Sequence, residues 1–80
     1  MKIIKLYANW CGPCKVVEQT LLDLGIEHES INIESDEGDE LASKYSIRSI
    51  PALLKFDGDK FIDKLVGNRS SNEIKEFCNA

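Results

Sequence analysis

Two cysteines near the start of the sequence have the spacing of a redox pair. Cys11 and Cys14 are separated only by Gly12 and Pro13, and Trp10 stands immediately before them. A thiolate attacks a disulfide, and a second thiol close by resolves the mixed disulfide that this attack creates. The spacing therefore predicts dithiol chemistry with one attacking thiol and one resolving thiol.

The elements around these cysteines favour an ionised Cys11. Residues 2–8, KIIKLYA, are rich in β-branched and aromatic side chains and predict a strand. Pro13 suits the first turn of a helix, so Cys11 is expected at the start of that helix and Cys14 one turn further in, as the resolving thiol. The N-terminus of a helix stabilises an anion. Lowering a cysteine pKa from about 8.5 to about 7 raises the ionised fraction at pH 7 from roughly 3% to half, which corresponds to about 2 kcal/mol.

Two other uses of the pair have less support. A structural disulfide between Cys11 and Cys14 closes a loop of four residues and removes about 2 kcal/mol of unfolded-chain entropy, against about 4.4 kcal/mol for a bridge to Cys78. A zinc site would need His28 and Cys78 as further ligands, and these two residues lack the paired spacing of zinc-binding motifs. The residues favour redox chemistry and no metal.

The third cysteine has the setting of a packing residue. Cys78 follows Ile74 and Phe77 on one face of an expected helix, where a free thiol acts as a small hydrophobic side chain. Cys11 does not fit that role, because it stands between Trp10 and a glycine. Three cysteines are also an odd number, which is unsuited to a disulfide framework.

The rest of the chain predicts an α/β fold in the order β-α-β-α-β-β-α. After the first strand we expect a helix through Val16 that ends at Gly25, a strand over 26–33, a helix over 35–45, strands over 51–56 and 60–66, and a last helix with a capping box at 70–73. Asp57-Gly58 indicates a two-residue turn between the last two strands. A βαβ unit followed by a hairpin and a helix gives a four-stranded mixed sheet flanked by helices.

Length and charge exclude several function classes. The 80 residues predict a single domain over 1–80, and the net charge of −4, with acids and bases interspersed, argues against nucleic-acid and membrane partners. No apolar run has the length of a membrane span, and the first residues are too charged for a signal peptide. We expect a cytoplasmic protein, in a compartment where thiols are mostly reduced.

Two segments resemble the thioredoxin family. The stretch WCGPCK, Trp10 to Lys15, matches the active-site motif of that family residue for residue, and Tyr45 to Gly67 is similar to its segment with a cis-proline, a hairpin and a groove glycine. The resemblance covers nearly the whole chain and implies the minimal, glutaredoxin-sized thioredoxin fold, with Cys11 as nucleophile and Cys14 as resolving thiol. It implies a groove for an extended substrate, formed by Trp10, Gly12, Pro13, Ile50, cis-Pro51 and Gly67.

The resemblance also implies an activity. A thioredoxin-like enzyme reduces disulfides in other proteins, needs no cofactor beyond the redox-active Cys11–Cys14 disulfide, and is itself reduced by a thioredoxin reductase. A glutaredoxin-like enzyme reduced by glutathione is the alternative that the short chain favours, and a non-enzymatic binding module is a third reading. We expect a monomer.

Lys5 is the main departure from the family pattern. Thioredoxins generally bury an acid six residues before the first cysteine, where it is thought to relay protons, and pair it with a lysine at the position that Ser30 occupies here. The usual proton relay is therefore expected to be absent. Ile3 and Tyr7 share a strand face with Lys5, so an ammonium buried beneath Cys14 would favour thiolate formation and tune the thiol pKa. The alternative is a Lys5 that points into solvent and has no effect.

Overall fold

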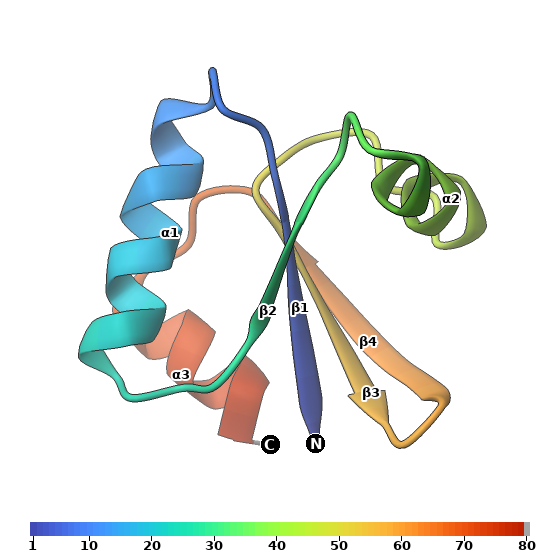
Figure 1. The fold of residues 1–80 in the computed structure, drawn as a ribbon. Coiled ribbons are helices and arrows are strands. Elements are labelled where there is room, and N and C mark those ends of the chain that lie inside the picture. Colours follow the sequence, from blue (N-terminus) through green and yellow to red (C-terminus); the bar gives the residue numbers. More distant parts are fainter. Residues whose placement is uncertain (80) are drawn as a thin grey trace.

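The computed structural model describes residues 1–79, which form a four-stranded sheet with helices on both faces (Figure 1). The sheet order is β2-β1-β3-β4, where β1 runs parallel to β2 and antiparallel to β3, and β3 runs antiparallel to β4. The predicted element order and the four-stranded mixed sheet are confirmed. The elements are β1 Lys2–Tyr7, α1 Gly12–Asp23, β2 Glu29–Asn32, α2 Asp36–Lys44, β3 Ala52–Asp57, β4 Lys60–Val66 and α3 Ser71–Asn79.

Strand β1 supplies the two cores of the molecule from its two faces. Ile3 packs with residues of α1 and α3 on one face of the sheet, whereas Ile4 and Leu6 belong to the cluster beneath α2 on the other. Figure 1 shows this division, with α1 and α3 on one side of the sheet and α2 on the other. Because side chains alternate along a strand, Lys5 lies on the α1 face together with Ile3. The central position of β1 thus places a lysine directly under the helix that begins at the cysteines.

The first helix ends just before Gly25, as predicted, whereas the second strand differs from its predicted range. The core face of α1 consists of Cys14, Val17 and Leu21, whereas Val16 is 54% exposed. Strand β2 is shorter than the predicted 26–33, because the backbone N–H of Ile26 donates to the Leu21 carbonyl and so belongs to the end of α1.

The turn between the last strands lies one residue later than the sequence indicated. Asp57 pairs with Lys60 across the hairpin, so the two-residue loop is Gly58-Asp59 rather than Asp57-Gly58. Gly58 has φ +61, a conformation that glycine adopts without the steric cost of a Cβ. The strand over 60–66 has the predicted bounds.

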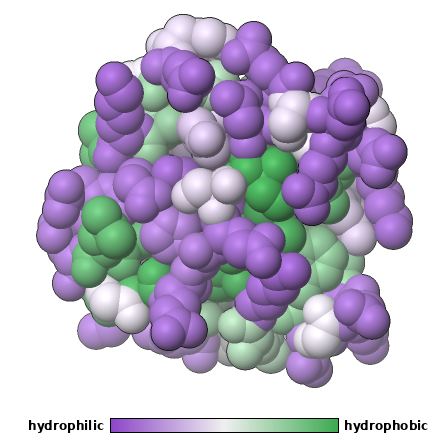
Figure 2. Space-filling view, viewed as in Figure 1, coloured by the Kyte–Doolittle hydropathy of each residue, from purple (hydrophilic) through white to green (hydrophobic). Residues whose placement is uncertain are grey.

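The surface is largely hydrophilic on the side that Figure 2 displays, where hydrophobic residues form small separate patches. The large hydrophobic side chains that are most exposed in residues 1–79 are Met1 and Trp10, at 71% and 70%. No helix within residues 1–79 is long and apolar enough to cross a membrane. Trp10 is thus a large apolar side chain presented to solvent directly beside the first cysteine.

Candidate active site

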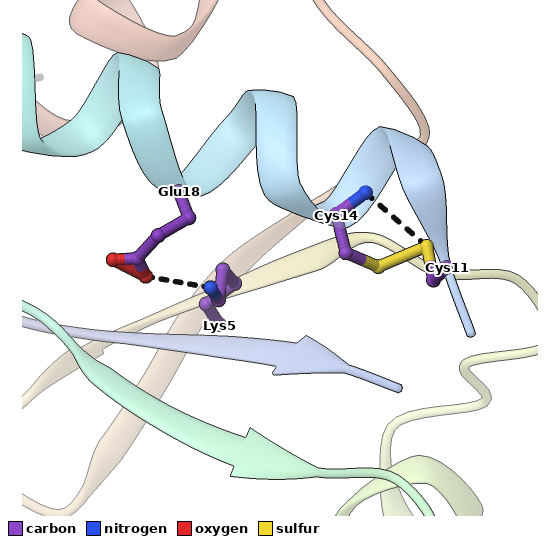
Figure 3. The surroundings of a disulfide bond; sticks show 4 residues. All are labelled: Lys5, Cys11, Cys14 and Glu18. Atoms are coloured by element: carbon purple, nitrogen blue, oxygen red, sulfur yellow. Dashed lines mark hydrogen bonds and ion pairs between the residues drawn. A yellow bond between two sulfur atoms is a disulfide. The ribbon is translucent and has the colours of Figure 1, made fainter. Parts of the chain in front are cut away.

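The two cysteines form a disulfide at the start of α1 (Figure 3). Cys11 is the N-cap residue of the helix, and its sulfur accepts a hydrogen bond from the backbone N–H of Cys14 at 3.2 Å. Both residues are buried, with Cys11 4% and Cys14 2% exposed. A backbone N–H and a helix N-terminus both stabilise negative charge on the Cys11 sulfur, so the physical setting that the sequence predicted for a thiolate is present.

The segment around Pro51 borders the disulfide. Ile50 packs against the cluster that contains Cys11 and Cys14, and the Ile50–Pro51 peptide bond is cis, as the family resemblance implies. The backbone N–H of Gly67 donates to the Pro51 carbonyl at 2.8 Å, which joins the β4–α3 connection to the same place. Gly67 has φ +96, so a side chain at this position would be strained.

The remaining predicted groove residues lie in the exposed turn that leads into α1. Trp10 is 70% exposed, and Gly12 and Pro13 are exposed in the first turn of the helix. These three residues are neighbours of Cys11 in the sequence. The fold brings Ile50, Pro51 and Gly67 to the same end of the sheet. The structure therefore supplies an exposed aromatic side chain and two backbone segments around the disulfide.

Lys5 is buried and does not point into solvent. Lys5 is 5% exposed, and its Nζ lies 2.6 Å from Oε1 of Glu18, a residue of α1 (Figure 3). The solvent-exposed alternative for Lys5 is therefore wrong. Position 5 lacks the acid that the family usually carries there, but a carboxylate is nevertheless present, because Glu18 projects from the helix onto the lysine that β1 presents.

Glu18 is held by several donors at once. His28 Nε2 lies 2.8 and 3.0 Å from its two carboxylate oxygens, and the Ser30 hydroxyl donates to Oε1 at 3.3 Å. Partial burial acts to raise the pKa of Glu18, but the hydrogen bonds and positive charges of Lys5 and His28 outweigh it and lower the pKa from 4.5 to about 2. Because His28 Nδ1 also faces the Ile26 carbonyl at 3.0 Å, the imidazolium form satisfies both acceptors.

This network reaches Cys14. Lys5, Cys14 and Glu18 line one hollow of about 380 Å³, together with Lys15 and residues of the β1–α1 connection. Sequence reasoning missed Glu18 because it sought the acid on the strand, at position 5. The signal was available, since Glu18 stands four residues after Cys14 and therefore on the same face of the helix. Ser30 is paired with Lys5 between β1 and β2, which explains its place in the network.

Cys78 has the packing role that the sequence predicted. It is partly buried against the cluster that contains Ile74 and Leu21, and burial raises the pKa of its thiol while the nearby Lys55 acts in the opposite direction. His28 is engaged by Glu18, and no group of His, Cys, Asp and Glu side chains within residues 1–79 is suited to hold a metal ion. The zinc alternative thus gains no support.

Comparisons with known proteins agree with this geometry. The family model named Thioredoxin matches residues 1–80. The chain is 35% identical over 78 residues to a thioredoxin of Mycoplasmoides gallisepticum, covering 94% of this chain and 78% of that protein. It is 37% identical over 81 residues to a thioredoxin of Buchnera aphidicola, covering 96% and 74%.

Solved structures give the same result for the fold. A mutant thioredoxin from Halobacterium salinarum superimposes with a TM-score of 0.80 at 28% identity, over 96% of this chain and 70% of that one. Mitochondrial thioredoxin 3 from Saccharomyces cerevisiae, in its oxidised form, superimposes with a TM-score of 0.77 at 24% identity, over 96% and 74%. The chain belongs to the thioredoxin family, and its Cys11–Cys14 pair makes it a thiol–disulfide oxidoreductase of that family.

Proposed function

We propose that Cys11 is the nucleophile and Cys14 the resolving thiol in the reduction of disulfides in other proteins. The observation that carries this assignment is the hydrogen bond from the Cys14 N–H to the Cys11 sulfur at the N-cap of α1. That bond and the helix N-terminus act on Cys11, so Cys11 is the thiol whose ionised form is stabilised.

The reaction follows from this assignment in two exchanges. The Cys11 thiolate attacks one sulfur of the substrate disulfide, forms a mixed disulfide and expels the other substrate sulfur as a thiolate. The Cys14 thiolate then attacks the Cys11 sulfur, which forms the Cys11–Cys14 disulfide and releases the first substrate sulfur as a thiolate. Two electrons pass to the substrate, and two protons from solvent convert the released thiolates to thiols.

The groove assignments extend this proposal to substrate binding. An extended substrate would lie over Trp10, Gly12 and Pro13 on one side and over Ile50, cis-Pro51 and Gly67 on the other. The exposure of Trp10 and the contact of Ile50 with the cysteine cluster support this path. Aromatic side chains presented to solvent beside a reactive group are typical of contact surfaces.

Lys5 is proposed to tune the thiols through its charge. The ammonium is neutralised by Glu18, so the pair beneath Cys14 carries no net charge, and a protonated His28 adds one positive charge. An aspartate at position 5 would instead place two carboxylates together beneath Cys14 and oppose thiolate formation. Relative to that variant, the thiolates of this protein are stabilised.

The proposal includes the setting in which the enzyme works. We propose a single-domain, monomeric, cytoplasmic enzyme whose only redox group is the Cys11–Cys14 disulfide and whose electron donor is a thioredoxin reductase. Its partners are disulfide-containing proteins rather than nucleic acids or membranes, as the net charge of −4 supports. Glutathione is the second candidate donor, favoured by the short chain, and the WCGPC motif favours the reductase.

Insulin reduction tests the enzyme against the binding-module alternative. With dithiothreitol as electron source, the protein should accelerate insulin disulfide reduction, and absence of turnover would leave only the binding module. Coupled assays with a thioredoxin reductase, or with glutathione and glutathione reductase, decide between the two donors. Cys14→Ser should trap substrates as mixed disulfides on Cys11, which gives a direct readout of the natural partners.

A further inference from the structure

The three segments that line the proposed groove carry only positive charges. Residues 8–16, 45–51 and 66–70 contain the basic residues Lys15, Arg48 and Arg69 and no Asp or Glu. The remaining seven basic residues and all fourteen acidic residues of the chain lie elsewhere. A molecule with a net charge of −4 thus has a groove whose own charge has the opposite sign.

The fold holds these three segments around the disulfide. Ile50 packs on the cysteine cluster at the start of α1, and the Gly67 N–H donates to the Pro51 carbonyl at 2.8 Å. Lys64 of β4 donates from Nζ to the Tyr45 carbonyl at 2.9 Å, which fixes the start of the middle segment to the last strand. The three basic residues therefore belong to segments that meet at one site, although they are far apart in the sequence.

The three cations are available to a partner. All three residues are exposed, and within residues 1–79 neither Lys15 nor Arg48 forms an ion pair. Arg69 lies 3.4 Å from Glu73 in a pair whose side chains are both about half exposed, and such pairs contribute little. Its Nε donates to the Val66 carbonyl at 2.9 Å, which keeps the guanidinium beside the groove glycine.

Glu18 and Glu34 lie near the cysteine cluster but outside the three groove segments. Glu18 lines the hollow beside Lys15, but Lys5, His28 and Ser30 already occupy its oxygens. Glu34 belongs to the β2–α2 connection, which approaches the cysteines through Ile33 from the side of the site opposite the β4–α3 connection (Figure 1). Carboxylates of a bound chain would be attracted along the groove and repelled by the β2–α2 side.

We infer that this enzyme prefers protein disulfides flanked by Asp and Glu residues, and that Lys15, Arg48 and Arg69 select them. The inference rests on the proposed reduction of protein disulfides and names the substrate class. Oppositely charged grooves raise association rates by factors of ten or more, and exposed charges act over about 30 Å at 0.01 M salt but only about 3 Å at 1 M. We therefore expect about a ten-fold preference for acidic flanks at low salt, which disappears at high salt.

The test compares two disulfide peptides that differ only in having Glu or Lys at the four positions flanking the disulfide. The measured quantity is the second-order rate constant for peptide reduction by the pre-reduced protein, followed by quenched flow and chromatography in 0.01 and 1 M salt. The parent should favour the Glu peptide about ten-fold in 0.01 M salt and less than two-fold in 1 M salt.

Two triple variants separate the groove cations from overall charge. Lys15→Gln/Arg48→Gln/Arg69→Gln should reduce the Glu-to-Lys preference to below about two-fold. Lys2→Gln/Lys60→Gln/Lys75→Gln makes the same change in net charge at exposed lysines outside the groove segments, and it should keep at least half of the parent preference. Equal rates for the two peptides with the parent, or equal losses in the two variants, would overturn the inference and leave the proposed function standing. Failure to reduce either peptide would overturn both.

Discussion

The most demanding prediction concerns the contribution of Glu18 to stability, because its carboxylate compensates the charge of a buried lysine and also contacts a histidine. Glu18→Gln keeps the shape of the side chain and removes its charge. The pKa of about 2, against an ordinary value of 4.5, means that the ionised carboxylate contributes at most about 3 kcal/mol to the free energy of unfolding. The Glu18 side chain is 32% exposed, so solvent screening reduces the expected loss in free energy of unfolding to about 2 kcal/mol at pH 7.

The stability contribution of Glu18 should decrease as the pH falls. The pKa of Glu18 is lower in the folded than in the unfolded protein, so its contribution is complete above about pH 5 and is lost as the pH falls towards 2. The difference in free energy of unfolding between the parent and Glu18→Gln should therefore shrink from about 2 kcal/mol at pH 7 to near zero at pH 2. Urea denaturation of the oxidised proteins at pH 7, 4 and 2 measures it.

Two comparisons show whether the ion pair is the cause. In a Lys5→Met background, Glu18→Gln should cost less than half as much, because the shortest of the contacts to the carboxylate is gone. Glu29→Gln is the matched surface control, since Glu29 pairs with Lys2 at 3.5 Å with both side chains more than half exposed, and it should cost less than about 0.5 kcal/mol. A Glu18→Gln loss no larger than that of Glu29→Gln, or one that does not depend on pH, would refute the reasoning.

Three further predictions concern the thiols. Cys11→Ser should abolish insulin reduction and Cys14→Ser should stop at the mixed disulfide, whereas Cys78→Ser should keep turnover within a factor of a few; an inactive Cys78→Ser would contradict the two-thiol mechanism. The reduction potential, measured by equilibration with glutathione, should lie in or near the range of roughly −270 to −200 mV, and a value near −120 mV would indicate an oxidant instead. The thiol pKa values from iodoacetamide alkylation rates should rise in the order parent, Lys5→Met, Lys5→Asp, and three indistinguishable profiles would exclude pKa tuning by Lys5.

The cysteine pair and the fold could be predicted from the sequence because their signals are local. The Cys-Gly-Pro-Cys spacing identifies both the redox group and the start of a helix, and each of the seven elements has its own residue pattern. The predicted hairpin loop lies one residue too early, because Asp57-Gly58 and Gly58-Asp59 are both good turn sequences. The pairing of Asp57 with Lys60 decides between them. The cis bond before Pro51 depended on the family resemblance, since an X–Pro bond is usually trans.

The surroundings of Lys5 could not be predicted from local pattern. The alternation along β1 places Lys5 on the same face as Ile3, but a lysine on a partly buried face can still extend its ammonium to water. Its actual position depends on Glu18, which reaches it from another element, thirteen residues further along the chain. Contacts of this kind combine the period of a helix with the order of strands in the sheet, and neither pattern alone specifies them.

The ion pair between Lys5 of β1 and Glu18 of α1 links the stability of this protein to its chemistry. A buried ammonium is tolerated only with a compensating charge, so Lys5 and Glu18 depend on each other for folding. The same pair faces the hollow that Cys14 lines, and its near-zero net charge removes the repulsion that a single buried carboxylate would exert on a thiolate. The carboxylate in this hollow has a pKa too low for it to hold a proton at neutral pH. Glu18 is thus unsuited to store the proton that Cys14 would release in the proposed reaction.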